Sequence, residues 1–124
     1  MQIESLKEHE KEVQYLEVVT PEVDVVCATY AQLYNVKFSG ADVNLGGART
    51  AKLSNGGVIG IRAPLRETEE PTVRHYTLVE DIQSAVTAAE KLGAEVAVPP
   101  MELPRHGMCA IVIQGGVELG FWEL

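Results

Sequence analysis

The chain has 124 residues, of which 46% are hydrophobic and 23% charged, so it suits one domain with a real core and disorder is not the default. Its 18 acidic and 10 basic residues give a net charge of −8, which argues against nucleic-acid and membrane partners because it repels phosphate backbones and anionic lipid. No apolar run approaches the roughly 20 residues that span a bilayer. The start, MQIESLKEHEKEV, is charged where a signal peptide is apolar, which predicts a cytoplasmic protein.

Residues 1–12 alternate charges without an apolar face, and we expect a mobile or weakly helical lead-in there. Segments 14–38 and 73–96 then describe one unit twice: an alternating strand, acidic residues, an amphipathic helix, and Asn or Gly. Each copy is followed by a strand, a Gly-Gly pair and a closing strand, in RTAKLSNGGVIGIRAPL and in GMCAIVIQGGVELGFWEL. The sequence therefore predicts a single pseudo-twofold domain, with module 1 at about 13–64, module 2 at about 72–124 and a shared cavity.

Apolar residues at helical spacing predict one helix in each module. The predicted buried stripes are Val23, Val26, Tyr30 and Leu33 in the first helix, and Ile82, Ala85, Val86, Ala89 and Leu92 in the second. Asn35 and Gly93 tolerate positive φ and are expected to end the two helices. Cys27 and Cys109 have no CxxC spacing, so we interpret both as small core residues, with a reactive thiol as the alternative for Cys109.

Period-two alternation in the strands separates a face that meets the helices from an opposite face. The residues predicted to face the helices include Leu16, Val18, Ile59, Ile61, Leu119 and Phe121. The opposite face is predicted to carry Tyr15, Glu17, Gly60, Arg62, Arg74, Tyr76, Gly120 and Trp122. A sheet with such a mixed face must curl into a cup, pair with another subunit or leave apolar surface exposed to water. We favour the cup, because Gly60 and Gly120 occupy matching places where glycine helps a strand to curve.

A resemblance to a known family rests on three stretches: YLEVVTPEVD, YTLVEDIQSAVTAAEKLGAEV and VAVPPMELPRHGMCAIVIQGGVELGFWE. In order and spacing these stretches resemble the vicinal oxygen chelate superfamily, which includes glyoxalase I, bleomycin-resistance proteins and extradiol dioxygenases. Within it the likeness is greatest to small glyoxalase-related proteins often called hydroxylases, and it covers Val13 to Leu124. The resemblance implies an α+β fold of paired βαβββ modules that form a U-shaped, glyoxalase-like sheet around a ligand cavity, commonly as a homodimer.

The same resemblance bears on metal binding. Metal-using members of the superfamily place His or Glu near the start of each module's first strand and on its last strand. The matching positions here are Tyr15, Arg74, Gly60 and Gly120. Divalent metals in such sites favour imidazole or carboxylate donors, and an arginine cation opposes the charge of a metal. We therefore expect no metal and no other cofactor, with a shifted metal site using Glu17, Glu118 or His106 as the alternative.

Two residues are candidates for catalysis by proton transfer. Glu17 suits a general base that takes a proton beside a carbonyl, and its alternative is a structural ion pair with Arg74. His106 lies in the turn-forming stretch PRHG, at a place where loops often cover binding sites, and its alternative is a solvated loop histidine.

Arg74 is the first candidate for ligand binding, because a guanidinium that faces a cavity can clamp a carboxylate or phosphate. Its alternative is a structural salt bridge to Glu17 on the neighbouring strand. Tyr76 and Trp122 suit stacking on an aromatic or sugar-like ligand, with core packing as the alternative for Trp122. The expected ligand-binding set is Tyr15, Glu17, Arg62, Arg74, Tyr76, His106 and Trp122.

Three functions follow from these residues. The first is a protein of the bleomycin-resistance kind that binds a small organic ligand in the sheet cavity without a metal. The net charge of the chain favours a cationic ligand, whereas Arg74 favours an anionic group. The alternative is a lyase or isomerase acting on a small carbonyl or organic-acid substrate, with Glu17 or His106 moving the proton. In the third, the sheet face is a subunit interface. Metal-dependent glyoxalase or dioxygenase chemistry is not expected, and the first function is our prediction.

Overall fold

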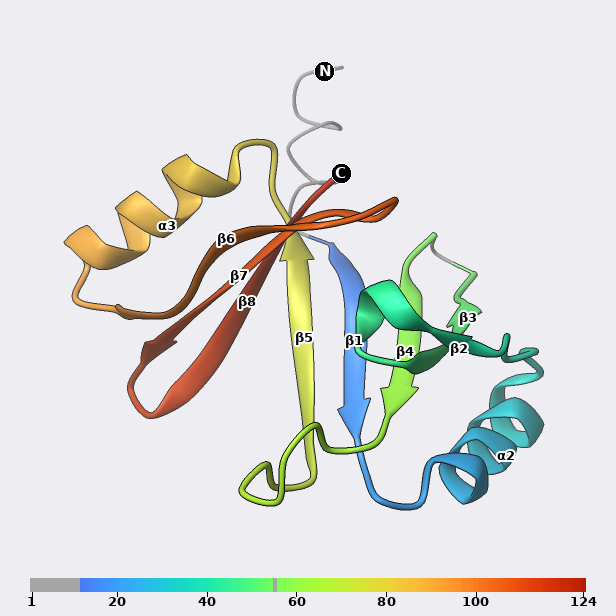
Figure 1. Ribbon diagram of the computed structural model, residues 1–124. Coiled ribbons are helices and arrows are strands. Elements are labelled where there is room, and N and C mark those ends of the chain that lie inside the picture. The colour runs from blue at the N-terminus through green and yellow to red at the C-terminus, as the bar shows by residue number, and fades with distance from the viewer. Residues whose placement is uncertain (1–11, 55) are drawn as a thin grey trace. The chain divides into compact units, whose positions relative to one another are not determined.

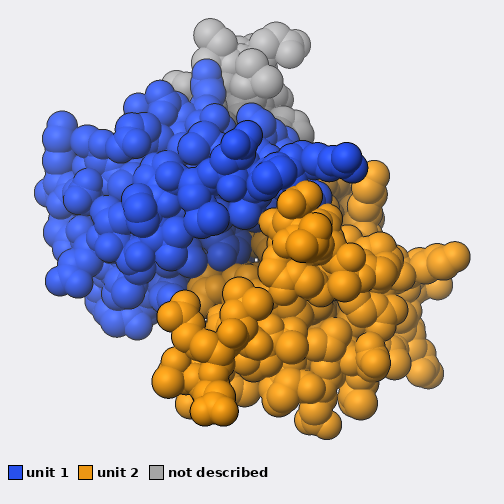
Figure 2. Space-filling view, in the orientation of Figure 1, with its two compact units in different colours: residues 1–14, 75–124 blue, residues 15–74 orange. Residues whose placement is uncertain are grey.

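The computed structural model describes residues 12–54 and 56–124, so the predicted lead-in at 1–12 lies outside the described residues apart from Glu12. The chain divides into two compact units, coloured separately in Figure 2. Of the described residues, unit 2 comprises those from 15 to 74, and unit 1 comprises residues 12–14 and 75–124. Each unit holds nearly all of one strand-helix-strand-strand-strand module, as the repeated sequence pattern predicts.

The first module lies almost entirely in unit 2. Its elements are β1 (Val13–Val19), α2 (Val23–Tyr34), β2 (Ala41–Asp42), the short 3-10 helix η1 (Val43–Leu45), β3 (Ala48–Lys52) and β4 (Val58–Arg62). The strands are ordered β2-β3-β4-β1, with β1 parallel to β4 and the other neighbours antiparallel. Two neighbouring parallel strands need a long crossover connection, which α2 and the β2–β3 segment supply.

Alternation along β1 and β4 packs one face of this sheet against α2, as predicted. Val18, Ile59 and Ile61 form a buried core with Cys27 of the helix, and Leu16 packs against it. The prediction for Leu33 is wrong, because its side chain is 69% exposed. The residues of α2 that pack in this core, Val23, Val26, Cys27 and Tyr30, all lie before the last turn of the helix, to which Leu33 belongs. Asn35 ends α2 in the left-handed conformation, with φ of 53°, as predicted.

The second module lies almost entirely in unit 1. Its elements are β5 (Thr72–Leu78), α3 (Ile82–Lys91), β6 (Glu95–Leu103), β7 (Gly107–Gln114) and β8 (Val117–Glu123). The strands are ordered β5-β8-β7-β6, with β5 parallel to β8 and the others antiparallel. β6 ends this order and carries Pro99 and Pro100, and its pairing with β7 shifts there because proline lacks the N–H that a central strand must donate.

Helix α3 packs on the strands of its own unit, and Figure 1 shows it alongside β6, β7 and β8. Ile82 and Val86 are buried in this core, where Leu119 and Phe121 of β8 pack against them as predicted. The prediction for Leu92 is wrong, since this side chain is 76% exposed. Leu92 caps the helix with non-helical backbone angles, so helical spacing no longer determines where its side chain lies. Gly93 follows with φ of 99°, as predicted.

The structure confirms the α+β class and the βαβββ order of each module. Both cysteines are buried, which confirms their interpretation as core residues, and burial raises the pKa of the Cys27 thiol. Neither described helix combines the length and the hydropathy needed to cross a membrane. The U shape of the sheet, the shared cavity and the homodimer stay predictions.

Candidate functional site

Charged residues gather in unit 2 on the face of the sheet opposite to α2. Glu17 of β1 lies in register with Gly60 of β4, and Arg62 follows two residues along β4 on the same face. Glu17 is 7% exposed and Arg62 is 6% exposed. Buried charges of this kind persist in proteins only when they are paired, so their partners define what the site can do.

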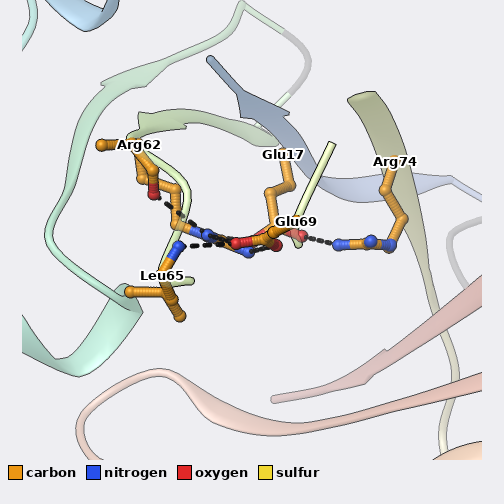
Figure 3. Close-up of polar contacts among 6 residues, drawn as sticks. Glu17, Arg62, Leu65, Glu69 and Arg74 are labelled. Atoms are coloured by element: carbon orange, nitrogen blue, oxygen red, sulfur yellow. Dashed lines mark hydrogen bonds and ion pairs between the residues drawn. The ribbon is translucent and has the colours of Figure 1, made fainter. Parts of the chain in front are cut away.

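Arg62 directs its guanidinium group at two carboxylates (Figure 3). Its Nε donates to Oε2 of Glu17 at 2.8 Å. Its Nη1 and Nη2 donate to Oε1 and Oε2 of Glu69 at 2.9 and 2.7 Å, and Nη1 also donates to the carbonyl oxygen of Ala63 at 3.2 Å. Two parallel N–H···O bonds between a guanidinium and a carboxylate are the strongest arrangement for this pair.

Glu17 lies between two guanidinium groups, because Arg74 donates from Nη1 to the other carboxylate oxygen, Oε1. The four residues Glu69, Arg62, Glu17 and Arg74 therefore form an alternating run of charges, which we call the charge chain. Their side chains are 18%, 7%, 9% and 11% exposed, in that order. Two carboxylates and two guanidinium groups leave the charge chain with no formal net charge.

The charge chain holds Glu69 in its ionised form. Hydrogen bonding to Arg62 is the largest cause that lowers the pKa of Glu69 to about 2, and the bond from the Leu65 backbone adds to it. The pKa of Arg62 is raised in turn, chiefly by its hydrogen bond to Glu69. At neutral pH both partners are therefore charged.

This geometry bears directly on the two roles predicted for Glu17 and Arg74. Both carboxylate oxygens of Glu17 accept hydrogen bonds from guanidinium groups, so a proton taken up by Glu17 would have to bind a remaining lone pair of an oxygen that is already an acceptor. The ion pair between Arg74 and Glu17, which the sequence offered as the alternative, is present. The base and clamp roles stay predictions.

Tyr15 explains why position 60 is glycine. The Tyr15 side chain is buried, and a Cβ added to Gly60 would lie 1.7 Å from its hydroxyl oxygen. A residue larger than glycine at position 60 would thus displace the phenol. Burial, reinforced by the negative charge of Glu17, raises the pKa of Tyr15 far above its usual range, so the phenol stays protonated.

The aromatic candidates form a second group, in unit 1. Tyr76 and Trp122 are buried, with ring centroids 5.6 Å apart and an edge-to-face angle of 76°. The indole Nε1 of Trp122 donates to the backbone oxygen of His106 at 3.1 Å. A Cβ added to Gly120 would lie 2.6 Å from Cδ2 of Tyr76 and 2.8 Å from the backbone oxygen of His75. Core packing, the alternative predicted for Trp122, describes its surroundings.

The structure thus divides the predicted ligand-binding set between the two units. Unit 2 brings together Tyr15, Glu17, Arg62 and Arg74. Unit 1 brings together Tyr76, His106 and Trp122. The two candidates for proton transfer, Glu17 and His106, belong to different units.

Sequence reasoning missed Glu69, which lies on the loop between β4 and β5. A signal for it was present. The alternation of side chains along the strands places Arg62, Arg74 and the carboxylate of Glu17 on the same face of the sheet. A second buried guanidinium group needs a second carboxylate as its partner. The loop sequence RETEE offers three candidates, and only the structure selects Glu69 among them.

The positions that hold metal in the resembled superfamily do not fit a metal ion here. The Tyr15 hydroxyl takes the space of a side chain at position 60, and Arg74 brings a cation already bound to Glu17. Within residues 12–54 and 56–124, no three His, Cys, Asp or Glu side chains lie close enough together to hold a metal. The shifted site predicted as an alternative therefore gains no support from the described residues.

No protein-family model and no curated protein matches the sequence, whereas solved structures match it over nearly its whole length. The hypothetical protein BH1468 of Bacillus halodurans C-125 matches with a TM-score of 0.72 and 16% identity, over 91% of this chain and 94% of that one. Methylmalonyl-CoA epimerase of Mycobacterium tuberculosis matches with a TM-score of 0.69 and 16% identity, over 90% and 86%. The Streptomyces coelicolor epimerase matches with a TM-score of 0.64 and 17% identity, over 91% and 96%.

The chain has the glyoxalase-like fold. The fold that the resemblance implies is thus confirmed, since the chain shares this architecture with methylmalonyl-CoA epimerase. At identities of 16% and 17% these similarities show a shared fold and nothing more, so the activity of the epimerases is not assigned to this chain.

Proposed function

We propose that this glyoxalase-like protein binds a small organic acid, or the carboxylate-bearing part of a larger ester, at the charge chain and without a metal ion. The observation that carries the proposal is the buried guanidinium of Arg62, which presents two parallel N–H donors to the carboxylate of Glu69. Ligands of this chemistry occur on the same fold, because a methylmalonyl-CoA epimerase is known in complex with methylmalonyl-CoA, and the Streptomyces coelicolor epimerase in complex with 2-nitronate-propionyl-CoA.

An anionic ligand is favoured over a cationic one by the range of the forces involved. The net charge of −8 is spread over the whole chain, and its field is screened within about 8 Å at physiological ionic strength. Arg62 and Arg74 act by direct contact in a site that is largely shielded from water, where hydrogen bonds to charged groups are strong. The local guanidinium groups therefore outweigh the global charge for a ligand that reaches them.

A second candidate function is isomerisation or lyase chemistry on such an acid. The shared fold with methylmalonyl-CoA epimerase favours it, and Glu17 is the carboxylate that would move the proton. Proton uptake would have to use a remaining lone pair of an oxygen that already accepts from Arg62 or Arg74, and it would remove the negative charge that both guanidinium groups contact. That requirement makes binding the first proposal and catalysis the second.

The proposal is tested by the effect of ligands on the melting temperature, since binding to the native state raises it. The panel is acetate, malonate, succinate and methylmalonyl-CoA, with choline and Zn²⁺ as the cationic and metal alternatives. We expect organic acids to raise the melting temperature of the wild type and of Arg49→Met, a control at an exposed ion pair, but not of Arg62→Met. The proposal is wrong if only choline or Zn²⁺ acts, or if Arg62→Met responds as the wild type does.

The remaining sequence-based expectations are part of the same proposal. A homodimer and a cytoplasmic location stay predictions, and bleomycin-like cations belong in the panel as the ligands of the binding branch that the sequence resembles. Sedimentation equilibrium tests the dimer directly.

A further inference from the structure

The loop that joins β4 to β5, residues 63–71, places one of its own carboxylates on Arg62. Leu65 to Thr68 are exposed, whereas the Glu69 side chain turns back and is only 18% exposed. Oε1 of Glu69 also accepts the backbone N–H of Leu65 at 2.7 Å, and the Glu69 N–H donates to the Arg66 carbonyl at 3.1 Å. An exposed loop is therefore joined to a buried guanidinium through a single side chain.

Arg62 is held in position by contacts that do not involve Glu69. Its Nε is fixed by Glu17 and its Nη1 by the carbonyl of Ala63. Its aliphatic stem packs beside Gly46, where an added Cβ would lie 3.1 Å from Cδ of Arg62. The Nη1–Nη2 edge therefore keeps its orientation when the carboxylate in front of it is exchanged, which is the condition for a pre-organised binding site.

We propose that the Nη1–Nη2 edge of Arg62 is a carboxylate-binding subsite that Glu69 fills from within the chain, and that a ligand carboxylate binds by displacing Glu69. The inference rests on the proposed function and specifies where the carboxylate of the ligand binds. Figure 3 shows the Glu69 carboxylate against this edge, with Glu17 between Arg62 and Arg74.

The charges of the site select the class of ligand. With Glu69 in place the charge chain is formally neutral, and without it two guanidinium groups and one carboxylate leave a single positive charge. A buried guanidinium that loses its partner is strongly unfavourable, so Glu69 leaves only when another anion replaces it. A ligand carboxylate reproduces both of the hydrogen bonds that Arg62 loses when Glu69 leaves, whereas a neutral or cationic ligand reproduces neither.

Glu69 also sets how tightly simple acids bind. A competitor on the same chain acts at an effective concentration of about millimolar or more, which lowers the apparent affinity of a free carboxylate. Because the pKa of Glu69 is about 2, the competitor stays charged throughout the physiological range. Displacement therefore responds to ligand concentration, and ligands with further contacts outcompete Glu69 where acetate alone binds weakly.

The test compares acetate binding to the wild type, Glu69→Ala, Glu69→Asp and Glu70→Ala by calorimetric titration, with chloride as the ionic-strength control. We expect acetate to bind Glu69→Ala at least tenfold more tightly than the wild type and to raise its melting temperature. Glu69→Asp keeps the charge on a shorter side chain, and we expect an intermediate gain. Glu70→Ala changes an exposed neighbouring carboxylate and should bind as the wild type does. Adding Arg62→Met to Glu69→Ala should abolish the gain.

The outcomes separate this inference from the proposed function. Equal acetate affinity in Glu69→Ala, Glu69→Asp and the wild type overturns the inference, even if the wild type binds organic acids elsewhere on the charge chain. A gain that survives Arg62→Met overturns it as well. An Arg62-dependent gain in Glu69→Ala, with no response of the wild type to any acid in the panel, supports the subsite but refutes the proposed function. If Glu69→Ala folds only when acetate is added, that dependence supports the subsite too.

Discussion

Replacing Arg62 by methionine tests whether the charge chain is the energetic centre of unit 2. Methionine keeps an unbranched apolar stem of similar length but lacks the guanidinium, so Glu17 and Glu69 both lose their bonds to position 62. Glu17 is 9% exposed at its side chain and would keep its ion pair with Arg74 but lose the one with Arg62. Removing one partner from a buried ion pair typically costs about 3–5 kcal/mol, because the remaining charge is left without compensation. We expect a loss in that range.

The matched control is Arg49→Met, which makes the same chemical change at an exposed pair. Arg49 donates to Asp24 at 3.0 Å, and these side chains are 33% and 91% exposed. Exposed pairs are worth about 1 kcal/mol or less, so this loss should be small. The difference between the two variants reports burial together with the second carboxylate that Arg62 binds, since the chemical change at the two positions is the same.

The measurement is urea unfolding followed by far-ultraviolet circular dichroism, with the free energy of unfolding taken from the linear extrapolation. Domains of this size have total stabilities of about 5–15 kcal/mol. Over most of that range the Arg62→Met variant stays folded in the absence of urea, so its unfolding curve has a native baseline. The slope of the free energy of unfolding against urea concentration should be the same as in the wild type. The reasoning is refuted if Arg62→Met and Arg49→Met lose the same free energy.

Three further predictions concern other parts of the structure. Gly60→Ala should destabilise the protein by about 1–3 kcal/mol, because its Cβ collides with the Tyr15 side chain. Gly40→Ala has nothing within 4 Å of its added Cβ and should be nearly neutral, so equal melting temperatures would contradict this explanation. The pKa of Glu69 falls from 4.5 to about 2 on folding, so its contribution is complete above pH 4.5 and is lost as the pH falls toward 2. Between pH 6 and 3 the free-energy difference between wild type and Glu69→Gln should therefore shrink by about 2 kcal/mol, and a pH-independent difference in urea titrations would exclude the assigned ion pair. Trp122, the only tryptophan, is 4% exposed, so iodide should barely quench its native fluorescence; quenching as strong as in urea would show that the indole is not buried.

The faces of the elements could be predicted from the sequence because side-chain direction follows a local period. Leu16, Val18, Ile59 and Ile61 were assigned to the helix side from alternation alone, and all four lie there. The same reasoning failed at Leu92, because the helical period ends where the backbone leaves the helix. The resemblance to the glyoxalase-like fold could also be recognised from the sequence, because it rests on the order of these elements along the chain.

The sequence by itself determined the repeated module, its two helices and the face on which Glu17, Arg62 and Arg74 lie, because these depend on backbone periods and on neighbours along the chain. Only the tertiary structure decided what those charges contact. Arg74 and Glu17 are 57 residues apart, and Glu69 was chosen over the other acidic residues of its loop by the path of that loop. A buried charge accepts whichever opposite charge the fold brings within hydrogen-bonding distance, and no local period encodes that choice.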